Sequence, residues 1–242
     1  MDDIRQYRVK TLAFIPARAG SVGIKNKNLQ RLGGKTLIQW AIAAAKQTTG
    51  IDHIVLSTDI PKALIPMKHI HGVEITNRPE NLRDGLSYTI ADVVINYLAS
   101  QYEEYDLVAL FQPTSPFVQP HQVEALIETL SIYNGALTYN SAQTVCVVPH
   151  NYHAFNQRVI NGNGSVEFDF PEERRIAPHK QDKPVLYKFG NMVVTKVSAL
   201  ESGGSMFPGP SWPNVVNWKH AIDIDTQEDL DIANLLYGME LV

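Results

Sequence analysis

The chain has 242 residues, of which 44% are hydrophobic and 19% charged, and its formal net charge is −4. This length suits one large domain or two small ones with a sizeable core. The charge balance shows no basic excess of the kind that nucleic-acid surfaces carry, and no apolar run is long enough to cross a bilayer. Cys146 is the only cysteine, which excludes an internal disulfide and a cysteine-rich zinc site. Because the N-terminus is polar and unlike a signal peptide, we expect a cytoplasmic protein with neither nucleic-acid nor membrane partners.

Strand and helix patterns alternate along the first half of the chain. Apolar, β-rich stretches predict strands at Thr11–Ile15, His53–Asp59, Gly72–Thr76 and Asp106–Pro116, the last stopped at Pro113. Helices are predicted at Thr36–Gln47, at Ser87–Ser100 and from Pro120 onward. This alternation is typical of an α/β protein with a doubly wound, mostly parallel sheet and helices on both faces. The loops after Ile15, Leu56 and Phe111 are then expected at one sheet edge, where ligands bind.

The pattern changes at Gly135. Short β segments (GALTY, TVCVV and GSVEFDF) and a polar run predict a β-rich excursion over residues 135–185, such as a hairpin arm used for oligomerisation. The chain then returns with a predicted strand at Val185–Val194 and another at Ala221–Ile224. Thr226 is expected to cap a final helix.

The loop that follows the first strand is small, flexible and cationic. Gly20 and Gly23 allow successive backbone N–H groups to form an anion cradle, and Ser21 adds a hydroxyl. Arg18, Lys25 and Lys27 supply positive charge within the same loop. The glycines alone are equally compatible with a solvated surface turn, but the three cations at the end of a strand favour a phosphate site.

The sequence IDIDT near the C-terminus contains two carboxylates. If Ala221–Ile224 is a strand, Asp223 and Asp225 project to one face, while Ile222 and Ile224 face the core. Paired carboxylates suit Mg²⁺, which prefers oxygen ligands. The alternative makes Asp225 a helix cap and Asp223 a solvated edge residue.

Two further loops contain polar residues near the expected ligand edge. In FQPTSP, Gln112 ends a buried strand where a substrate would lie, although, taken alone, a strand stop with a capping turn explains this segment better than a ligand site does. In NRPENLRDG, Arg78 and Arg83 lie in a loop that by itself is a solvated connection.

Five segments in this order, IPARAGSVGIKNKN, STD, NRPENL, FQPTSP and IDIDT, resemble the acylneuraminate cytidylyltransferases, which make CMP-sialic acid and related compounds. The resemblance extends from Leu12 to the last helix. It implies a single Rossmann-like nucleotidyltransferase domain over residues 1–242. It also implies the transfer of CMP from CTP to a nine-carbon 2-keto sugar acid, with Mg²⁺ as cofactor and pyrophosphate as product.

The resemblance implies a role for each matching position. The triphosphate and ribose loop would be Arg18, Ser21, Lys27 and Asn28, and the metal-binding carboxylates would be Asp223 and Asp225. Arg78 would contact the cytosine, with Ser87 nearby, and Gln112 would face the sugar acid. Arg174 or Arg175 would be the arginine that this family often supplies from the partner subunit. The β excursion would be the arm of a homodimer.

Three features depart from the family pattern. The family loop has the sequence R-G-G-S-K-G, whereas this chain has Ala19 and Val22, so that one lysine is missing and Lys25 is the nearest substitute. The family's N-G pair near the sugar site is reversed here to Gly190 and Asn191. The segment IAPHK is inserted after Arg175. The first departure concerns the triphosphate, and the other two concern the identity of the sugar acid.

Two alternative functions remain open from the sequence. One is a cytidylyltransferase for another sugar acid, such as an eight-carbon acid. The other is a nucleotide-binding module that kept the fold and lost turnover, for which Val22 is the only hint.

Overall fold

A seven-stranded sheet organises the chain in the computed structural model, which describes residues 8–21, 23–65, 70–83, 88–101, 104–132 and 138–242. The strand order is β11-β7-β10-β6-β1-β4-β5. The strands are β1 (Thr11–Ala17), β4 (His53–Thr58), β5 (Glu74–Asn77), β6 (Leu107–Phe111), β7 (Ser141–Val147), β10 (Tyr187–Lys196) and β11 (Ser211–Val215). Only β10 runs antiparallel to its neighbours, so the predicted mostly parallel α/β sheet is confirmed.

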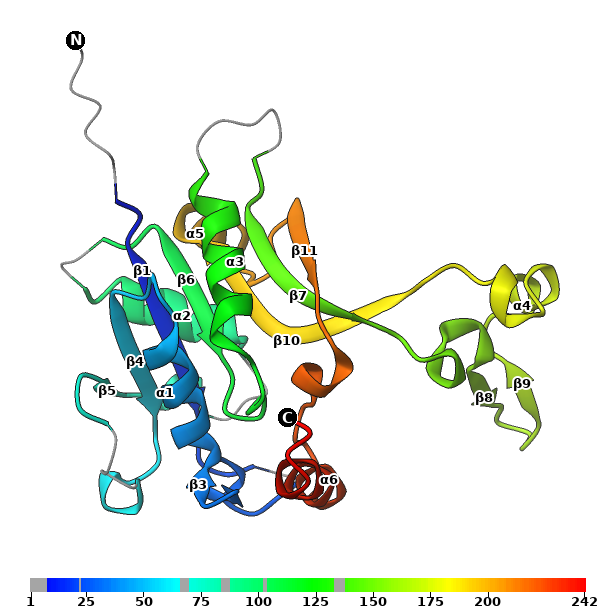
Figure 1. Ribbon diagram of the computed structural model, residues 1–242, viewed down its shortest axis with the longest axis horizontal. Helices are drawn as coiled ribbons and strands as arrows, with labels where there is room; N and C mark the ends of the chain where they lie inside the picture. The colour runs from blue at the N-terminus through cyan, green and yellow to red at the C-terminus, as the bar shows by residue number, and fades with distance from the viewer. Residues whose placement is uncertain (1–7, 22, 66–69, 84–87, 102–103, 133–137) are drawn as a thin grey trace, which may run out of the picture.

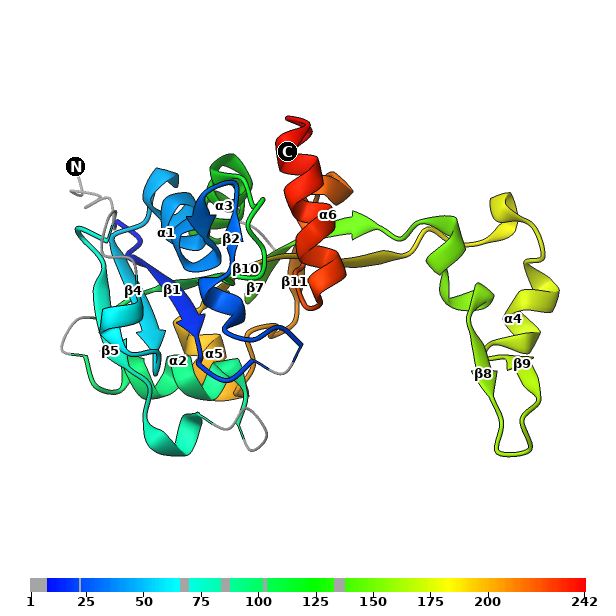
Figure 2. The same cartoon turned by 90° about the horizontal axis from the view of Figure 1, so that it is seen from below.

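Helices cover both faces of this sheet, as the alternation of patterns predicts (Figures 1 and 2). On one face lie α1 (Leu37–Gln47) and α3 (Pro120–Ser131), whose apolar side chains pack with Ala13 and Ile15 of β1. On the other lie α2 (Ile90–Leu98) and α5 (Val197–Gly203), which pack with Leu12 and Phe14. The strand β1 is buried along its whole length, which explains its continuous apolar sequence.

Local capping chemistry sets where the main helices begin. Thr36, Thr89 and Thr226 each accept a hydrogen bond from a backbone N–H one turn on, and each forms a capping box with a polar partner three residues later. Such a cap contributes about 1 kcal/mol to helix stability. The final helix is α6 (Gln227–Gly238). Thr226 was expected as a cap, and this prediction is confirmed.

The strands β7 and β10 continue as a two-stranded ribbon out of the sheet and carry an arm (Figures 1 and 2). The arm holds the hairpin β8 (Arg158–Ile160) and β9 (Val166–Phe168) and the short helix α4 (Pro171–Ile176). The sequence predicted that the excursion spans residues 135–185, but Ser141–Val147 pairs with β10 and β11 in the central sheet. The arm therefore begins after Val147.

Two other sequence predictions differ from the structure. The strand expected at Ala221–Ile224 does not form: Trp218–Ala221 is a 3₁₀ helix, and residues 222–225 belong to no helix or strand. The strand β11 was not predicted, since Trp212 and Pro213 interrupt any simple alternation. Small additional elements are the hairpin β2 (Arg31–Leu32) and β3 (Lys35–Thr36). Within the described part of the chain, no helix is long and apolar enough to cross a membrane.

Candidate active site

A cavity of about 560 Å³ lies at the carboxyl ends of β1 and β6. This is the sheet edge at which ligand-binding loops were predicted. Eight of the twelve site residues predicted from the sequence line it: Arg18, Ser21, Lys27, Asn28, Arg78, Gln112, Asp223 and Asp225. The tertiary structure thus brings together segments that are separated by up to about 200 residues in the chain.

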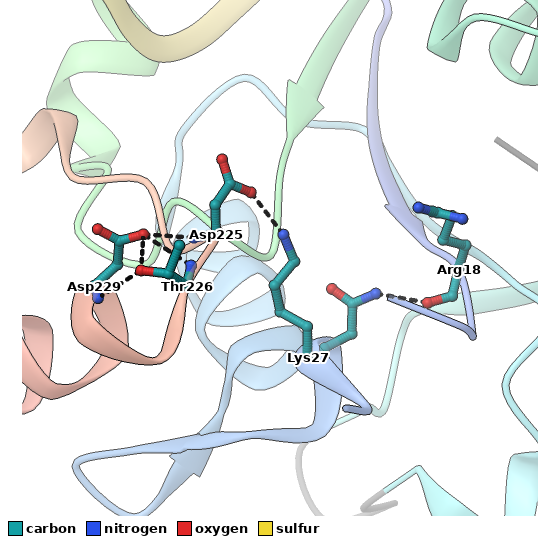
Figure 3. Close-up of polar contacts among 6 residues, drawn as sticks. Arg18, Lys27, Asp225, Thr226 and Asp229 are labelled. Carbon is teal, nitrogen blue, oxygen red and sulfur yellow. Dashed lines mark hydrogen bonds and ion pairs between the residues drawn. The ribbon is translucent and has the colours of Figure 1, made fainter. Parts of the chain in front are cut away.

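The loop after β1 is held in place by hydrogen bonds to its backbone. The side chain of Asn28, which is buried, donates to the carbonyl of Arg18 at 2.8 Å (Figure 3). Asp59 accepts a hydrogen bond from the backbone N–H of Ala19. Gly20 has φ of +71°, a conformation that glycine adopts at little cost. These hydrogen bonds fix the backbone of Arg18 and Ala19 at the start of the loop, beside the cavity.

At Gly23 this loop makes a close backbone contact with the acidic segment near the C-terminus. A Cβ added at Gly23 would lie 2.3 Å from the backbone oxygen of Asp225, so no larger residue fits. Lys27 bonds the same residue: its Nζ lies 2.8 Å from Asp225 Oδ1, and its side chain is only 17% exposed (Figure 3). These contacts place a partly desolvated ammonium directly beside a carboxylate.

The segment 222–225, which contains both aspartates, is held by hydrogen bonds to the loop after β6 and to the start of α6. Ile224 is fully buried, and its N–H donates to the carbonyl of Thr114 in the loop after β6. The carboxylate of Asp229 accepts hydrogen bonds from the backbone N–H groups of Asp225 and Thr226 (Figure 3). Thr226, and not Asp225, is the helix cap. Asp223 and Asp225 consequently keep the alternation expected for a strand without belonging to one.

Asp223 has a pKa raised above its ordinary value. Protein atoms packed around the carboxyl are the main cause, and a hydrogen bond from Thr114 offsets part of their effect. The negative charge of Asp225 raises the pKa further, while Lys27 lowers it. The raised pKa means that the ionised carboxyl of Asp223 is less favourable here than it is in water.

Arg78 is almost completely buried, with 1% of its surface exposed. Its Nη1 donates to the hydroxyl of Tyr88 at 3.0 Å, while its Nε has no hydrogen-bond partner. Arg83 Nε donates to the backbone carbonyl of Arg78 and supports the loop. In the described part of the chain no carboxylate lies within ion-pair distance of Arg78, so a buried cation lines the cavity with an unused donor.

A family model for cytidylyltransferases matches residues 12–190. The chain belongs to the cytidylyltransferase family. It is 28% identical to a CMP-N,N'-diacetyllegionaminic acid synthase of Legionella pneumophila over 239 residues, which cover 96% of this chain and 97% of the relative. It is 36% identical to an N-acylneuraminate cytidylyltransferase of Escherichia coli over 129 residues, which cover 52% of this chain and 30% of the relative. The recognition of the family from its motifs is confirmed.

The fold also resembles solved cytidylyltransferases. A CMP:2-keto-3-deoxy-manno-octonic acid synthetase complexed with CTP superposes with a TM-score of 0.68 at 18% identity, covering 96% of this chain and 99% of that one. At that identity the likeness supports the Rossmann-like fold and nothing finer.

Three other predicted site residues of this cytidylyltransferase, Lys25, Arg174 and Arg175, do not line the cavity. Lys25 is exposed, and its carbonyl accepts a hydrogen bond from Gln30. Arg174 and Arg175 lie on α4, on the arm (Figure 2). Ser87 and Val22 fall outside the described residues.

The two arm arginines differ in their surroundings. Arg175 forms an exposed ion pair with Glu172 at 2.9 Å. Arg174 donates to the carbonyl of Pro178, and its guanidinium lies over the ring of Phe168. Arg174 is therefore the arginine whose charge is free of an ion pair with any described carboxylate.

Sequence reasoning missed Tyr88 and Asp229 as supporting residues. Asp229 had a detectable signal, because a threonine followed three residues later by an acidic residue is a capping box. Tyr88 had none, since its contact with Arg78 joins residues that are ten positions apart in the chain.

Proposed function

We propose that this protein transfers CMP from CTP to a nine-carbon 2-keto sugar acid of the sialic-acid type and releases pyrophosphate. The Legionella relative matches over nearly its whole length and is named as the synthase of a CMP-linked acid, and the Escherichia coli relative is named for N-acylneuraminate. The observation that carries the proposal is the single cavity shared by the cationic loop and the carboxylates of Asp223 and Asp225. That arrangement suits a polyanionic nucleotide and a metal-assisted transfer.

We further propose that Mg²⁺ binds at Asp223 and Asp225. Mg²⁺ typically takes one or two carboxylates and completes its shell with waters and substrate phosphates. Among the described residues no third His, Cys, Asp or Glu joins the pair, which leaves positions for phosphate oxygens. The raised pKa of Asp223 fits a carboxylate that needs a cation beside it. When bound, the metal neutralises phosphate charge and acidifies the attacking hydroxyl.

The protein's own residues would position the reactants and stabilise charge. Backbone N–H groups of the loop from Arg18 to Gly23 would hold the triphosphate, and Lys27 would stabilise the departing pyrophosphate. Gln112 would hold the sugar acid so that its anomeric hydroxyl attacks the α-phosphorus in line with the leaving group. Asp225 lies close enough to Lys27 to orient its ammonium.

Pyrophosphate release from CTP with a panel of eight-carbon and nine-carbon sugar acids tests the proposed function. We expect release with a nine-carbon acid and little with an eight-carbon one. The reverse preference would refute the proposed acceptor. CTP binding by calorimetry without release from any acid would instead identify a nucleotide-binding module.

We predict that CTP is preferred over UTP by about a hundredfold. Arg78 lines the cavity and has a buried Nε without a hydrogen-bond partner. A site whose donors and acceptors match one base leaves some of them without partners when another base binds, and this lowers activity with the second nucleotide. Arg78→Met, which keeps the side chain's volume, is expected to erode this preference. Turnover with both nucleotides is the measurement, and Arg31→Ala, at an exposed arginine outside the cavity, is the control. Equal use of CTP and UTP by the wild type would refute the assignment.

We predict a homodimer assembled through the arm. Large apolar residues on the arm and its base are exposed. Among them are Tyr152, Ile160 and Ile176, each with more than 70% of its surface exposed to solvent. The β8–β9 hairpin is a separate two-stranded sheet, which is marginally stable without further cover. Sedimentation at micromolar concentration should give twice the 27.0 kDa chain mass. A fully active monomer would exclude both the interface and a partner-supplied Arg174.

A further inference from the structure

The turn after β6 brings Thr114 to the edge of the cavity. Within this turn the backbone N–H of Ser115 donates to the carbonyl of Gln112 at 3.0 Å. Pro113 and Ser115, on either side of Thr114, are buried, and Thr114 itself lines the cavity. Because a proline ring fixes φ and a hydrogen bond closes the turn, the backbone at Thr114 has little freedom to move. The side chain of Thr114 is therefore attached at a fixed point beside the site.

Thr114 contacts the acidic segment through both its backbone and its side chain. Its carbonyl accepts a hydrogen bond from the N–H of Ile224 at 2.9 Å. Its hydroxyl forms a hydrogen bond with the carboxyl of Asp223, the residue before Ile224. Ile224 and Phe117 belong to one buried apolar cluster, so packing also joins the loop after β6 to the acidic segment. These contacts fix both the place and the orientation of the Asp223 side chain.

The hydrogen bond with Thr114 uses one part of the Asp223 carboxylate. An ionised carboxylate has two oxygens that only accept hydrogen bonds, and a threonine hydroxyl has one hydrogen to donate. Thr114 thus engages one oxygen of Asp223 and leaves the second for a ligand. Asp225 has the same arrangement, because its Oδ1 lies 2.8 Å from Lys27 Nζ. Each aspartate of the pair therefore has one oxygen bonded to a donor of the protein itself.

This arrangement suits a small cation better than a large one. Mg²⁺ requires near-ideal octahedral geometry and takes one or two carboxylates together with waters and substrate phosphates. Ca²⁺ takes more oxygen ligands at longer distances, and both oxygens of one carboxylate can bind it. For Asp223 to bind an ion through both oxygens, its hydrogen bond with Thr114 has to break. The hydroxyl of Thr114 therefore opposes the mode of binding that is open to Ca²⁺.

We propose that Thr114 is a positioning residue that holds Asp223 to single-oxygen ligation and thereby selects Mg²⁺ over Ca²⁺. It acts through Asp223 and does not itself bind the ion. This inference rests on the Mg²⁺ site of the proposed function, and it adds the residue that sets which ion the site accepts. Replacing a residue that orients a metal ligand typically lowers metal affinity by about 10–100-fold.

Two substitutions at Thr114 test the proposal. Thr114→Val keeps the shape of the side chain and removes the hydroxyl, while Thr114→Ser keeps the hydroxyl. Thr129→Val is the matched control, because it removes a hydroxyl that bonds the carbonyl of Ala125 on α3, away from the cavity. The measurement is the Tm across separate titrations with Mg²⁺ and with Ca²⁺, with turnover followed over the same range of Mg²⁺.

In Thr114→Val we expect the Mg²⁺ concentration at the midpoint of the Tm rise to increase by about tenfold or more, and the Ca²⁺ midpoint not to increase. The Mg²⁺ concentration for half-maximal turnover should increase by the same factor, whereas kcat at saturating Mg²⁺ should change much less. Thr114→Ser and Thr129→Val should keep the wild-type midpoints for both ions.

An unchanged Mg²⁺ midpoint in Thr114→Val would overturn the proposal, as would equal increases in the Mg²⁺ and Ca²⁺ midpoints. Equal losses in Thr114→Val and Thr114→Ser would also overturn it, because the hydroxyl would then not be the cause. A wild-type Tm that Mg²⁺ does not raise overturns both this inference and the proposed metal site. Pyrophosphate release tests the transferase function separately. Loss of Mg²⁺ preference in Thr114→Val, without release by wild type from any acid, supports the inference while the transferase function fails.

Discussion

Asp223→Asn is expected to lower kcat by about 10²–10³-fold while the protein stays folded. The substitution keeps the size of the side chain and removes the charge that, in the proposed mechanism, holds Mg²⁺ beside the α-phosphate. Turnover measured across a Mg²⁺ titration should show that extra metal does not restore the variant. Asp231→Asn, on an exposed face of α6, is the matched control. Near-wild-type turnover at all Mg²⁺ concentrations would show that Asp223 has no role in metal binding.

The same variant should be at least as stable as wild type at neutral pH. The pKa of Asp223 is raised in the folded protein, so its ionised form is disfavoured there relative to the unfolded chain. This penalty is fully present above the folded pKa and disappears as the pH falls through it. Asparagine removes the penalty, and the difference in Tm between variant and wild type should shrink as the solution is acidified. Mg²⁺ should raise the Tm of wild type and not that of Asp223→Asn.

Lys27→Ala is expected to lower kcat by about a hundredfold with a smaller change in the KM for CTP. Its ammonium lies 2.8 Å from Asp225 Oδ1. In the proposed mechanism, negative charge accumulates on the departing pyrophosphate beside this ammonium. Steady-state kinetics with CTP varied at saturating acid measures the effect. A change confined to KM would show that Lys27 binds ground state and transition state equally.

Lys25→Ala is the matched comparison within the same loop. Lys25 is exposed and does not line the cavity, but it lies three residues after Val22, the position at which the family pattern implied by the resemblance has a lysine. If it replaces that lysine, Lys25→Ala raises the KM for CTP several-fold and leaves kcat unchanged. Unchanged CTP kinetics, together with tighter CTP binding by Val22→Lys, would refute the compensation.

Much of the fold follows from patterns that are local in the sequence. Short windows of about fifteen residues were enough to predict the buried strand β1, the capped helix α1 and the alternation of strands and helices through α3. This is possible because burial of a strand on both faces and capping of a helix each depend on residues that are close in the sequence. The cationic loop after β1 was also identifiable, since its glycines and charges are contiguous. The pairing of Asp223 with Asp225 was detectable from a spacing of two, even though no strand forms there.

Other features depend on contacts between distant segments. Ser141–Val147 joins the central sheet because β10 and β11 return to flank it, and its own sequence resembles that of an arm strand. Gly23 and Gly190 must be glycine because backbone atoms of Asp225 and Thr144 approach them across the fold. The ion pair of Lys27 with Asp225 likewise arises where separate segments of the chain meet. Hydrogen bonding and close packing between such segments depend on their arrangement in space, and only the tertiary structure decides it.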